Sequence, residues 1–108
     1  SDNSDVLRGD DGENTLEGGR GNDILTGYGS RDTFVFKGND GNDRITDFDP
    51  GTDLVELTGI AGLANFTDVQ AALTQDGSDT VLDLGDGQTI RFDHMLVNSL
   101  TANDFNFV

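Results

Sequence analysis

A carboxylate, or its amide relative, recurs every nine residues in the first third of the chain. The positions that carry it are Asp5, Asn14, Asp23 and Asp32. An apolar side chain follows two residues after each of them, at Leu7, Leu16, Leu25 and Phe34. A period of nine matches neither the 3.6-residue period of a helix nor the alternation of a single strand. It fits a coil of short strands and tight turns, in which each copy contributes one strand, and we expect the apolar positions, with Ile45, to form an internal ladder.

The most complete copy of this repeat predicts a site for calcium. It reads Gly18-Gly19-Arg20-Gly21-Asn22-Asp23-Ile24-Leu25-Thr26. Its glycines permit positive φ angles, so that backbone carbonyl oxygens can point inward. Calcium takes about six to eight oxygen ligands in flexible geometry, which carbonyl groups and one Asp per turn can supply jointly. The predicted ligands in this copy are the Asp23 carboxylate and the carbonyls of Gly18, Arg20 and Gly21.

The repeat also predicts which copies meet. One copy turns the chain by half a coil, so turns on the same side lie two copies apart. This arrangement pairs Asp5 with Asp23, Asn14 with Asp32, and Asp23 with Asp43. We expect the side carrying Asp5, Asp23 and Asp43 to bind more strongly. On the other side Asn14 is uncharged, Tyr28 and Ser30 replace glycines, and Arg31 stands next to Asp32.

Composition excludes several classes of protein. The chain has 21 acidic and 6 basic residues and a formal net charge of -15. Such a charge repels nucleic acid and anionic membrane surfaces, because phosphate binding needs clusters of Lys and Arg. Divalent cations are attracted instead. Cysteine is absent, so neither a disulfide framework nor a thiolate metal site exists, and no apolar run has the length of a membrane span.

The chain divides into two halves of different character. Residues 1–58 hold 14 of the 21 acidic residues and 10 of the 15 glycines, and they contain the repeats. Residues 59–108 read as a cap. In this half, residues 65–73 resemble a short helix with Thr67 or Asp68 as its N-cap. Residues 80–84 and 88–92 flank a Gly-Asp-Gly turn and predict a β-hairpin, and the tail from residue 96 predicts a final strand or short turn, with Phe105 and Phe107 in the core.

The repeats closely resemble the RTX (repeat-in-toxin) family, through residues 18–26 and the copies that flank them. This resemblance implies an all-β fold: a right-handed parallel β-roll that holds calcium between successive turns, here with a C-terminal hairpin or sandwich-like cap and one short helix. Residues 32–57 look like the segment that closes such rolls in serralysin-type proteases and mannuronan C5-epimerases. In that segment the family often places further calcium ligands, so Asp40, Asp43 and Asp47 are additional candidates.

The expected function is calcium-dependent folding of a C-terminal module of a larger secreted protein. Ser1 opens the chain inside a partial copy, which favours a piece of a longer chain. A chain of this charge should stay expanded where calcium is scarce, and calcium outside the cell would then drive folding. The ending is similar to those of proteins exported by type I secretion machinery, although an ordinary terminal strand stays open as an alternative. The residues of this ending are Asp104, Phe105, Phe107 and Val108. We expect an extracellular monomer that is not itself an enzyme.

Other functions are considered beside this one. A module that binds an anionic polysaccharide such as alginate would need bridging calcium or a basic stripe, for which the candidates are Arg8, Arg20, Arg31, Lys37 and Arg44. No catalytic constellation indicates an enzyme. Residues 47–53 fail the EF-hand pattern because of Pro50 and the lack of flanking helices, and we expect a turn between strands there and at residues 76–79. His94, the only histidine, is predicted to be a solvated or hydrogen-bonded loop residue.

Overall fold

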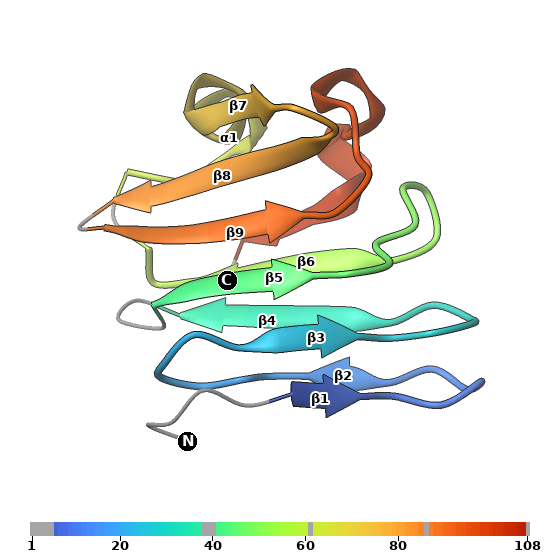
Figure 1. Cartoon of the computed structure of the whole chain (residues 1–108). Coiled ribbons are helices and arrows are strands. Elements are labelled where there is room, and N and C mark those ends of the chain that lie inside the picture. Colours follow the sequence, from blue (N-terminus) through green and yellow to red (C-terminus); the bar gives the residue numbers. More distant parts are fainter. Residues whose placement is uncertain (1–5, 38–40, 61, 86, 108) are drawn as a thin grey trace.

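Short strands alternate between two layers along the first half of the chain (Figure 1). The computed structural model describes residues 6–37, 41–60, 62–85 and 87–107. One sheet has six strands, in the spatial order β1 (Val6–Arg8), β3 (Ile24–Thr26), β5 (Asn42–Ile45), β9 (Gln88–Phe92), β8 (Asp79–Gly85) and β7 (Leu73–Asp76). The other has four, in the order β10 (Phe105–Phe107), β6 (Leu54–Thr58), β4 (Thr33–Lys37) and β2 (Thr15–Leu16).

The first six strands form the expected parallel β-roll. Neighbouring strands within each layer are two copies apart in sequence, as β1 and β3 are, and they pair in parallel. Because the chain crosses to the other layer after every strand, each complete coil uses two copies of the repeat. The coils stack from β1 and β2 at one end to β5 and β6 (Figure 1), so corresponding residues of successive coils lie in register.

Two apolar ladders fill the space between the layers. In the six-stranded sheet, the register aligns Leu7, Leu25, Ile45 and Phe92. In the four-stranded sheet it aligns Leu16, Phe34, Val55 and Phe105. All of these side chains are buried except Leu7, which is partly buried against the core. The predicted internal ladder is therefore confirmed, and each buried member contributes about 1.5–3 kcal/mol by leaving water.

The second half of the chain continues both layers instead of forming a separate one. The predicted hairpin is present as β8 and β9, and β9 pairs in parallel with β5. The predicted final strand is β10, which pairs in parallel with β6. Two short 3₁₀ helices, Val97–Ser99 and Ala102–Asp104, precede it. These pairings place the cap directly on the last coil of the roll, while the division at residue 58 stays a prediction.

The α-helix of the described residues, α1 (Phe66–Ala72), has its N-cap two or three residues earlier than the sequence suggested. Its N-cap is Asn65, whose Oδ1 accepts the N–H of Asp68 at 3.0 Å. The expectation of Thr67 or Asp68 as cap is wrong, because both lie inside the first turn. Asp68 instead accepts the N–H of Ala64 at 3.0 Å. The helix buries Val69 against the cap.

A chain of aromatic contacts joins the two layers and the helix. Phe48 lies against Phe34 and Phe92, with ring centroids 6.1 and 5.4 Å apart. Phe105 contacts Phe92 at 6.5 Å and Phe66 at 5.8 Å. Phe105 is a core residue as predicted, whereas Phe107 is only partly buried. Among the described residues, no helix is long and apolar enough to cross a membrane.

Candidate metal centre

The strand register stacks the repeat carboxylates into two columns at opposite edges of the roll. We define the first column as Asp23 and Asp43, and the second as Asn14, Asp32 and Asp53. Asp23 directly precedes β3 and Asp43 lies near the start of β5, so the pairing of Ile24 with Arg44 sets Asp23 beside Asp43. The same relation in the four-stranded sheet aligns the second column. Asp5, like the candidate ligand Asp40, lies outside the described residues.

Within each column, a carboxylate of one turn binds the backbone of the turn before it. Oδ1 of Asp43 accepts the N–H of Asp23 at 2.9 Å. Oδ1 of Asp32 accepts the N–H of Asn14 at 2.9 Å, and Oδ1 of Asp53 accepts the N–H of Asp32 at 2.9 Å. The carboxylates therefore point along the roll axis in a common direction. The structure thus brings together the predicted pairs Asn14–Asp32 and Asp23–Asp43.

The second oxygen of Asp32 has a different environment. Asp32 is 0% exposed, and its Oδ2 is buried and accepts no hydrogen bond within the described part of the chain. A buried carboxylate oxygen in that state is costly unless a cation or a donor reaches it. Asp23, at 1% exposed, occupies the equivalent position in the first column. The carboxylates of Asp32 and Asp23 are therefore both in positions suitable for metal ligands.

The first glycine of each repeat makes room for these side chains. A Cβ added to Gly18 would lie 2.3 Å from Oδ2 of Asp23. A Cβ added to Gly27 would lie 2.3 Å from Oδ2 of Asp32. Real Cβ atoms do not approach that closely, so any other residue at these two positions would displace the carboxylate. Gly18 thus has a steric role beside its predicted role as a carbonyl ligand.

The second and fourth positions of the repeat keep a left-handed backbone even without glycine. Gly19 and Gly21 have φ angles of 78° and 99°. Tyr28 and Ser30, at the same positions of the next copy, have φ angles of 67° and 64°. The turn geometry is therefore preserved at the cost of strain, since a bulky residue rarely adopts positive φ. The side chain of Ser30 compensates in part by donating to the carbonyl of Asp11 at 2.7 Å.

The turn at residues 9–14 is the exception among the repeats. Neither Asp10 nor Gly12, at the second and fourth positions, has positive φ. Oδ1 of Asp10 instead accepts the N–H of Gly12 at 2.8 Å and the Nδ2 of Asn14 at 3.1 Å. These hydrogen bonds lower the pKa of the exposed Asp10 carboxyl. The side chain of Asn14 therefore stabilises this turn, and its Nδ2 also donates to Oδ1 of Asp32 at 3.2 Å.

The remaining predicted ligands lie in or beside the turns. The carbonyl of Gly21 faces the next turn, because a Cβ on Gly41 would lie 2.5 Å from that oxygen. Arg20 is exposed in the same turn. Asp47 lies on the opposite edge, where its two oxygens accept the N–H groups of Gly27 at 3.0 Å and Tyr28 at 2.7 Å. Asp47 therefore bridges two turns.

Sequence reasoning missed Asp53, which aligns with Asp32 but follows it by 21 residues instead of 18. A signal was present, because Gly51-Thr52-Asp53-Leu54-Val55 repeats the spacing of glycine, acid and apolar residue. Residues 47–53 otherwise form the expected turn between strands. Burial raises the pKa of the Asp53 carboxyl above its ordinary value of 3.8, although the N–H groups of Asp32 and Asp49 oppose this shift. The charges of Asp32 and Asp47 raise the same pKa further.

The donor atoms fit calcium. No group of three His, Cys, Asp or Glu side chains close enough to hold a metal occurs among the described residues. A metal held by the described residues would use backbone carbonyl and side-chain oxygens from two turns, a mixture that calcium accepts. A cavity of about 280 Å³ opens beside the first column, between residues 22–24 and 42–44. The buried Oδ2 of Asp32, which accepts no hydrogen bond from the described residues, is the oxygen that most directly fits a cation ligand.

The five basic candidates for polysaccharide binding do not form one stripe. Arg8 and Arg44 belong to the six-stranded sheet and Lys37 to the four-stranded sheet. Arg20 and Arg31 lie in turns at opposite edges of the roll. Arg44 pairs with Asp93 at 3.1 Å, Lys37 with Glu17 at 3.2 Å, and Arg31 donates to the carbonyl of Thr52 at 3.1 Å. The five residues are therefore spread over both sheets and both edges, and polysaccharide binding through them stays a prediction.

The predicted export ending is part of the fold. Asp104 is 0% exposed, and its oxygens accept the N–H groups of Gly51 and Thr101, each at 2.8 Å. Phe105 begins the strand β10. Val108 lies outside the described residues. In the folded chain Phe105 and Phe107 lie in this strand, and the role of the segment in export stays a prediction.

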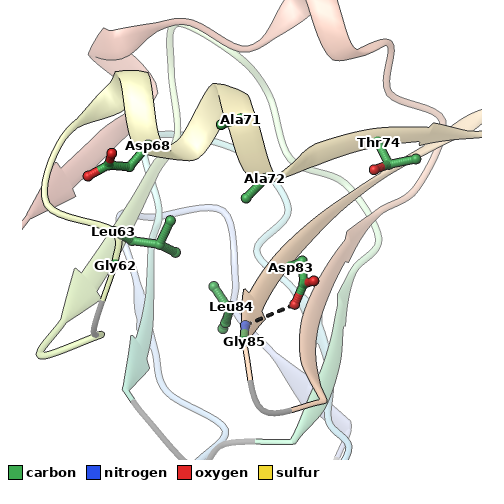
Figure 2. A pocket seen from close by; sticks show the side chains of 9 residues that line it. All are labelled: Gly62, Leu63, Asp68, Ala71, Ala72, Thr74, Asp83, Leu84 and Gly85. Carbon is green, nitrogen blue, oxygen red and sulfur yellow. Dashed lines mark hydrogen bonds between the residues drawn. The ribbon is translucent and has the colours of Figure 1, made fainter.

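Two further features have local roles. His94 is an exposed turn residue whose N–H donates to Asp79 at 2.9 Å, as predicted. A cavity of about 420 Å³ lies between α1 and the end of β8, and Figure 2 shows the small and apolar side chains that line it. Its carboxylates, Asp68 and Asp83, each accept a backbone N–H of a neighbouring turn. They therefore stabilise local structure beside the cavity.

Comparison with known proteins places the repeats in a family. The model of the RTX calcium-binding nonapeptide repeat matches residues 1–34 and 35–48. Endo-1,3-1,4-beta-glycanase EglC of Rhizobium meliloti is 41% identical over 74 residues, which are 68% of this chain and 16% of that protein. This chain thus spans about a sixth of the length of the curated relative that it matches.

Two solved structures resemble the fold. The extracellular lipase LipA of Serratia marcescens matches with a TM-score of 0.80 and 24% identity, over 100% of this chain and 20% of the lipase. The AlgE6R3 subunit of the Azotobacter vinelandii mannuronan C5-epimerase matches with a TM-score of 0.46 and 25% identity, over 98% of this chain and 79% of that subunit. The lipase match supports the β-roll architecture along the whole chain. Residues 1–48 are therefore RTX haemolysin-type calcium-binding nonapeptide repeats, and the rest of the chain extends the two layers of the roll that they form.

Proposed function

We propose that this module binds calcium between successive turns of the roll and that binding drives its folding. The observation that carries the proposal is the buried Oδ2 of Asp32, which accepts no hydrogen bond from the described residues. Asp23 and Asp43 supply carboxylates on the other edge, and the carbonyls of the glycine turns supply the remaining oxygens. A bound divalent cation would offset the mutual repulsion of stacked carboxylates in a chain of net charge -15.

Calorimetric titration with calcium and with magnesium tests this proposal. We expect heat of binding with calcium and much weaker binding with magnesium, because magnesium demands a stricter octahedral geometry. Asp32→Asn should remove or weaken one class of sites, and Asp23→Asn should do so on the other edge. Glu13→Gln is the matched control, since it removes one charge from an exposed side chain in a turn of the same roll. Equal calcium binding by all four proteins would refute the proposed ligands.

We further propose that the module is a C-terminal part of a longer protein that is secreted through a type I channel and folds outside the cell. The support is the RTX family match and the extracellular lipase whose fold this chain shares. Because Asp104 and Phe105 are buried in the folded chain, a channel would have to recognise this ending before folding. A passenger protein fused ahead of this chain should reach the medium only in cells with a type I channel. Equal export in cells without that channel would contradict the proposal.

The polysaccharide-binding alternative stays a prediction. EglC is named as a glycanase, but the basic residues that would contact an anionic sugar chain are dispersed over both sheets and both edges. Titration with oligouronates in the presence of calcium, monitored by chemical-shift changes, would test it. Shifts that disappear on Arg→Ala substitution at Arg44 or Arg20 would favour a binding module.

A further inference from the structure

Neighbouring carboxylates of the second column differ in how their oxygens are used. Oδ1 of Asp32 accepts the N–H of Asn14, and Oδ2 accepts no hydrogen bond from the described residues. In Asp53 both oxygens are used, because Oδ1 accepts the N–H of Asp32 and Oδ2 accepts the N–H of Asp49, each at 2.9 Å. Asp32 therefore has an oxygen available to bind a metal ion, whereas both oxygens of Asp53 already accept backbone hydrogen bonds.

Other groups of the turn at residues 47–53 are also hydrogen-bonded to the preceding coil. The oxygens of Asp47 accept the N–H groups of Gly27 and Tyr28 at 3.0 and 2.7 Å. Nε of Arg31 donates to the carbonyl of Thr52 at 3.1 Å. Hydrogen bonds in which one partner is charged are about twice as strong as neutral ones. These contacts fasten the turn to the coil below it without a cation.

The C-terminal segment fastens the same turn from the other side. Gly51 donates its N–H to Oδ1 of Asp104, a residue 53 positions later in the chain. Oδ2 of Asp104 accepts the N–H of Thr101 at 2.8 Å and its hydroxyl at 3.4 Å. Asp104 is completely buried, so its two oxygens are matched by donors inside the fold.

We propose that the turn at residues 47–53 is a metal-independent closure of the roll, in which backbone N–H groups occupy the oxygens of Asp53, Asp47 and Asp104. Calcium is then required by the coils below this turn, whereas the end formed by β6, β8, β9 and β10 is held without it. This inference rests on the proposed function for its calcium-dependent part, but the metal-independent part can be measured alone.

The coil at the start of the roll is less well buried than the closed end, although Leu25 and Phe34 of the coil between them are 0% exposed. The cap and the last coil contribute the fully buried side chains Val55, Val69, Leu82, Ile90 and Phe92. At the other end of the roll, Leu7 is only partly buried and Val6 is 57% exposed. Burial of apolar surface therefore supports the closed end more than the coils of β1 and β2.

Hydrogen exchange of the full chain, with calcium and with chelator, tests the inference. In chelator we expect the amides of β6, β8, β9 and β10 to remain protected and those of β1, β2 and β3 to exchange freely. Calcium should then protect the second group. Uniform loss of protection in chelator would overturn the inference, even if calcium binds. Absence of any calcium effect, with protection of the closed end intact, would refute the proposed function and leave the closure standing.

Two variants separate the closure from the calcium sites. Asp104→Asn replaces one acceptor oxygen by a donor, so it should lower protection in chelator while the number of calcium ions bound at saturation stays unchanged. Asp32→Asn should do the opposite, with protection in chelator kept and calcium binding weakened. Loss of calcium ions in Asp53→Asn or Asp104→Asn would overturn the inference. If Asp104→Asn fails to fold even with calcium, the exchange pattern of the unmodified chain in chelator decides.

Discussion

Gly27 lies directly against the carboxylate of Asp32, so closely that a Cβ on the glycine would stand 2.3 Å from Oδ2. The same relation holds between Gly18 and Asp23 in the preceding copy. The repeat therefore needs glycine at its first position for space and not for a positive φ angle, which neither residue has. Sequence and site are linked at this contact, since the glycine fixes where the carboxylate can point.

Gly27→Ala should displace the Asp32 carboxylate and weaken calcium binding. We expect a loss of affinity of about tenfold or more, equivalent to about 1.4 kcal/mol. Gly29→Ala is the matched control, because its nearest atom, the carbonyl oxygen of Asp11, would be 3.9 Å from the new Cβ. Calorimetric titration of both variants compares them directly. Similar affinities would show that Asp32 is not a ligand in this orientation.

Tyr28→Gly should stabilise the calcium-loaded module. The left-handed backbone at Tyr28 costs about 1–2 kcal/mol for a residue with a Cβ. Glycine also increases the conformational entropy of the unfolded chain, which offsets about 0.4–1 kcal/mol of that stabilisation. The expected net increase in the free energy of unfolding is on the order of 0.5–1 kcal/mol. Denaturant unfolding at saturating calcium measures it, and Gly19→Ala should have the opposite sign. A loss of stability in Tyr28→Gly would mean that the ring makes contacts that outweigh the strain.

The raised pKa of Asp53 predicts a pH dependence for the calcium-free fold. A carboxyl whose pKa is higher in the folded state binds protons more tightly there, so folding is favoured as pH falls. The free energy of unfolding in chelator should therefore rise as pH is lowered from neutral toward the ordinary pKa of 3.8. This gain is lost again as pH rises through the folded pKa. Asp53→Asn should flatten the dependence, and an equally steep profile in that variant would assign it to other carboxyls.

Asn65→Ala should destabilise the cap by about 1 kcal/mol, because the N-cap side chain accepts the N–H of Asp68. Thr67→Ala should change the free energy of unfolding much less, since Thr67 is exposed inside the helix. Thermal unfolding at fixed calcium concentration compares the two. Equal losses of stability in the two variants would contradict the assignment of Asn65 as the N-cap.

The sequence predicted the parts of this molecule that follow from a fixed period. The nine-residue spacing placed Leu25 and Phe34 inside and set Asn14 beside Asp32, because a constant coil length fixes both register and face. The prediction failed where the period breaks. Asp53 follows Asp32 by 21 residues, so the spacing of glycine, acid and apolar residue recurs there out of period, and the pairing of β4 with β6 aligns the two carboxylates. The hydrogen bond from Gly51 to Asp104 spans 53 residues, so no local pattern could reveal it.

The arrangement of the basic residues could not be read from the sequence for a related reason. Arg8, Arg20, Arg31, Lys37 and Arg44 lie in or beside the repeats, but consecutive strands belong to opposite layers of the roll. Residues one copy apart therefore face different surfaces, whereas residues two copies apart share one. The helix cap was misplaced for a purely local reason, because Asn65, Thr67 and Asp68 are all good caps and only the observed hydrogen bond distinguishes them.

Far-UV circular dichroism of this chain, in chelator and during calcium titration, tests the central claim most directly. Calcium-driven folding of the repeat coils predicts a cooperative gain of strand signal as calcium is added, and its reversal when the ion is removed. The gain should be weakened in Asp32→Asn and retained in Glu13→Gln. A spectrum that is unchanged by calcium, at concentrations where calorimetry detects binding, would contradict the account, because the ion would then bind a roll that is already formed.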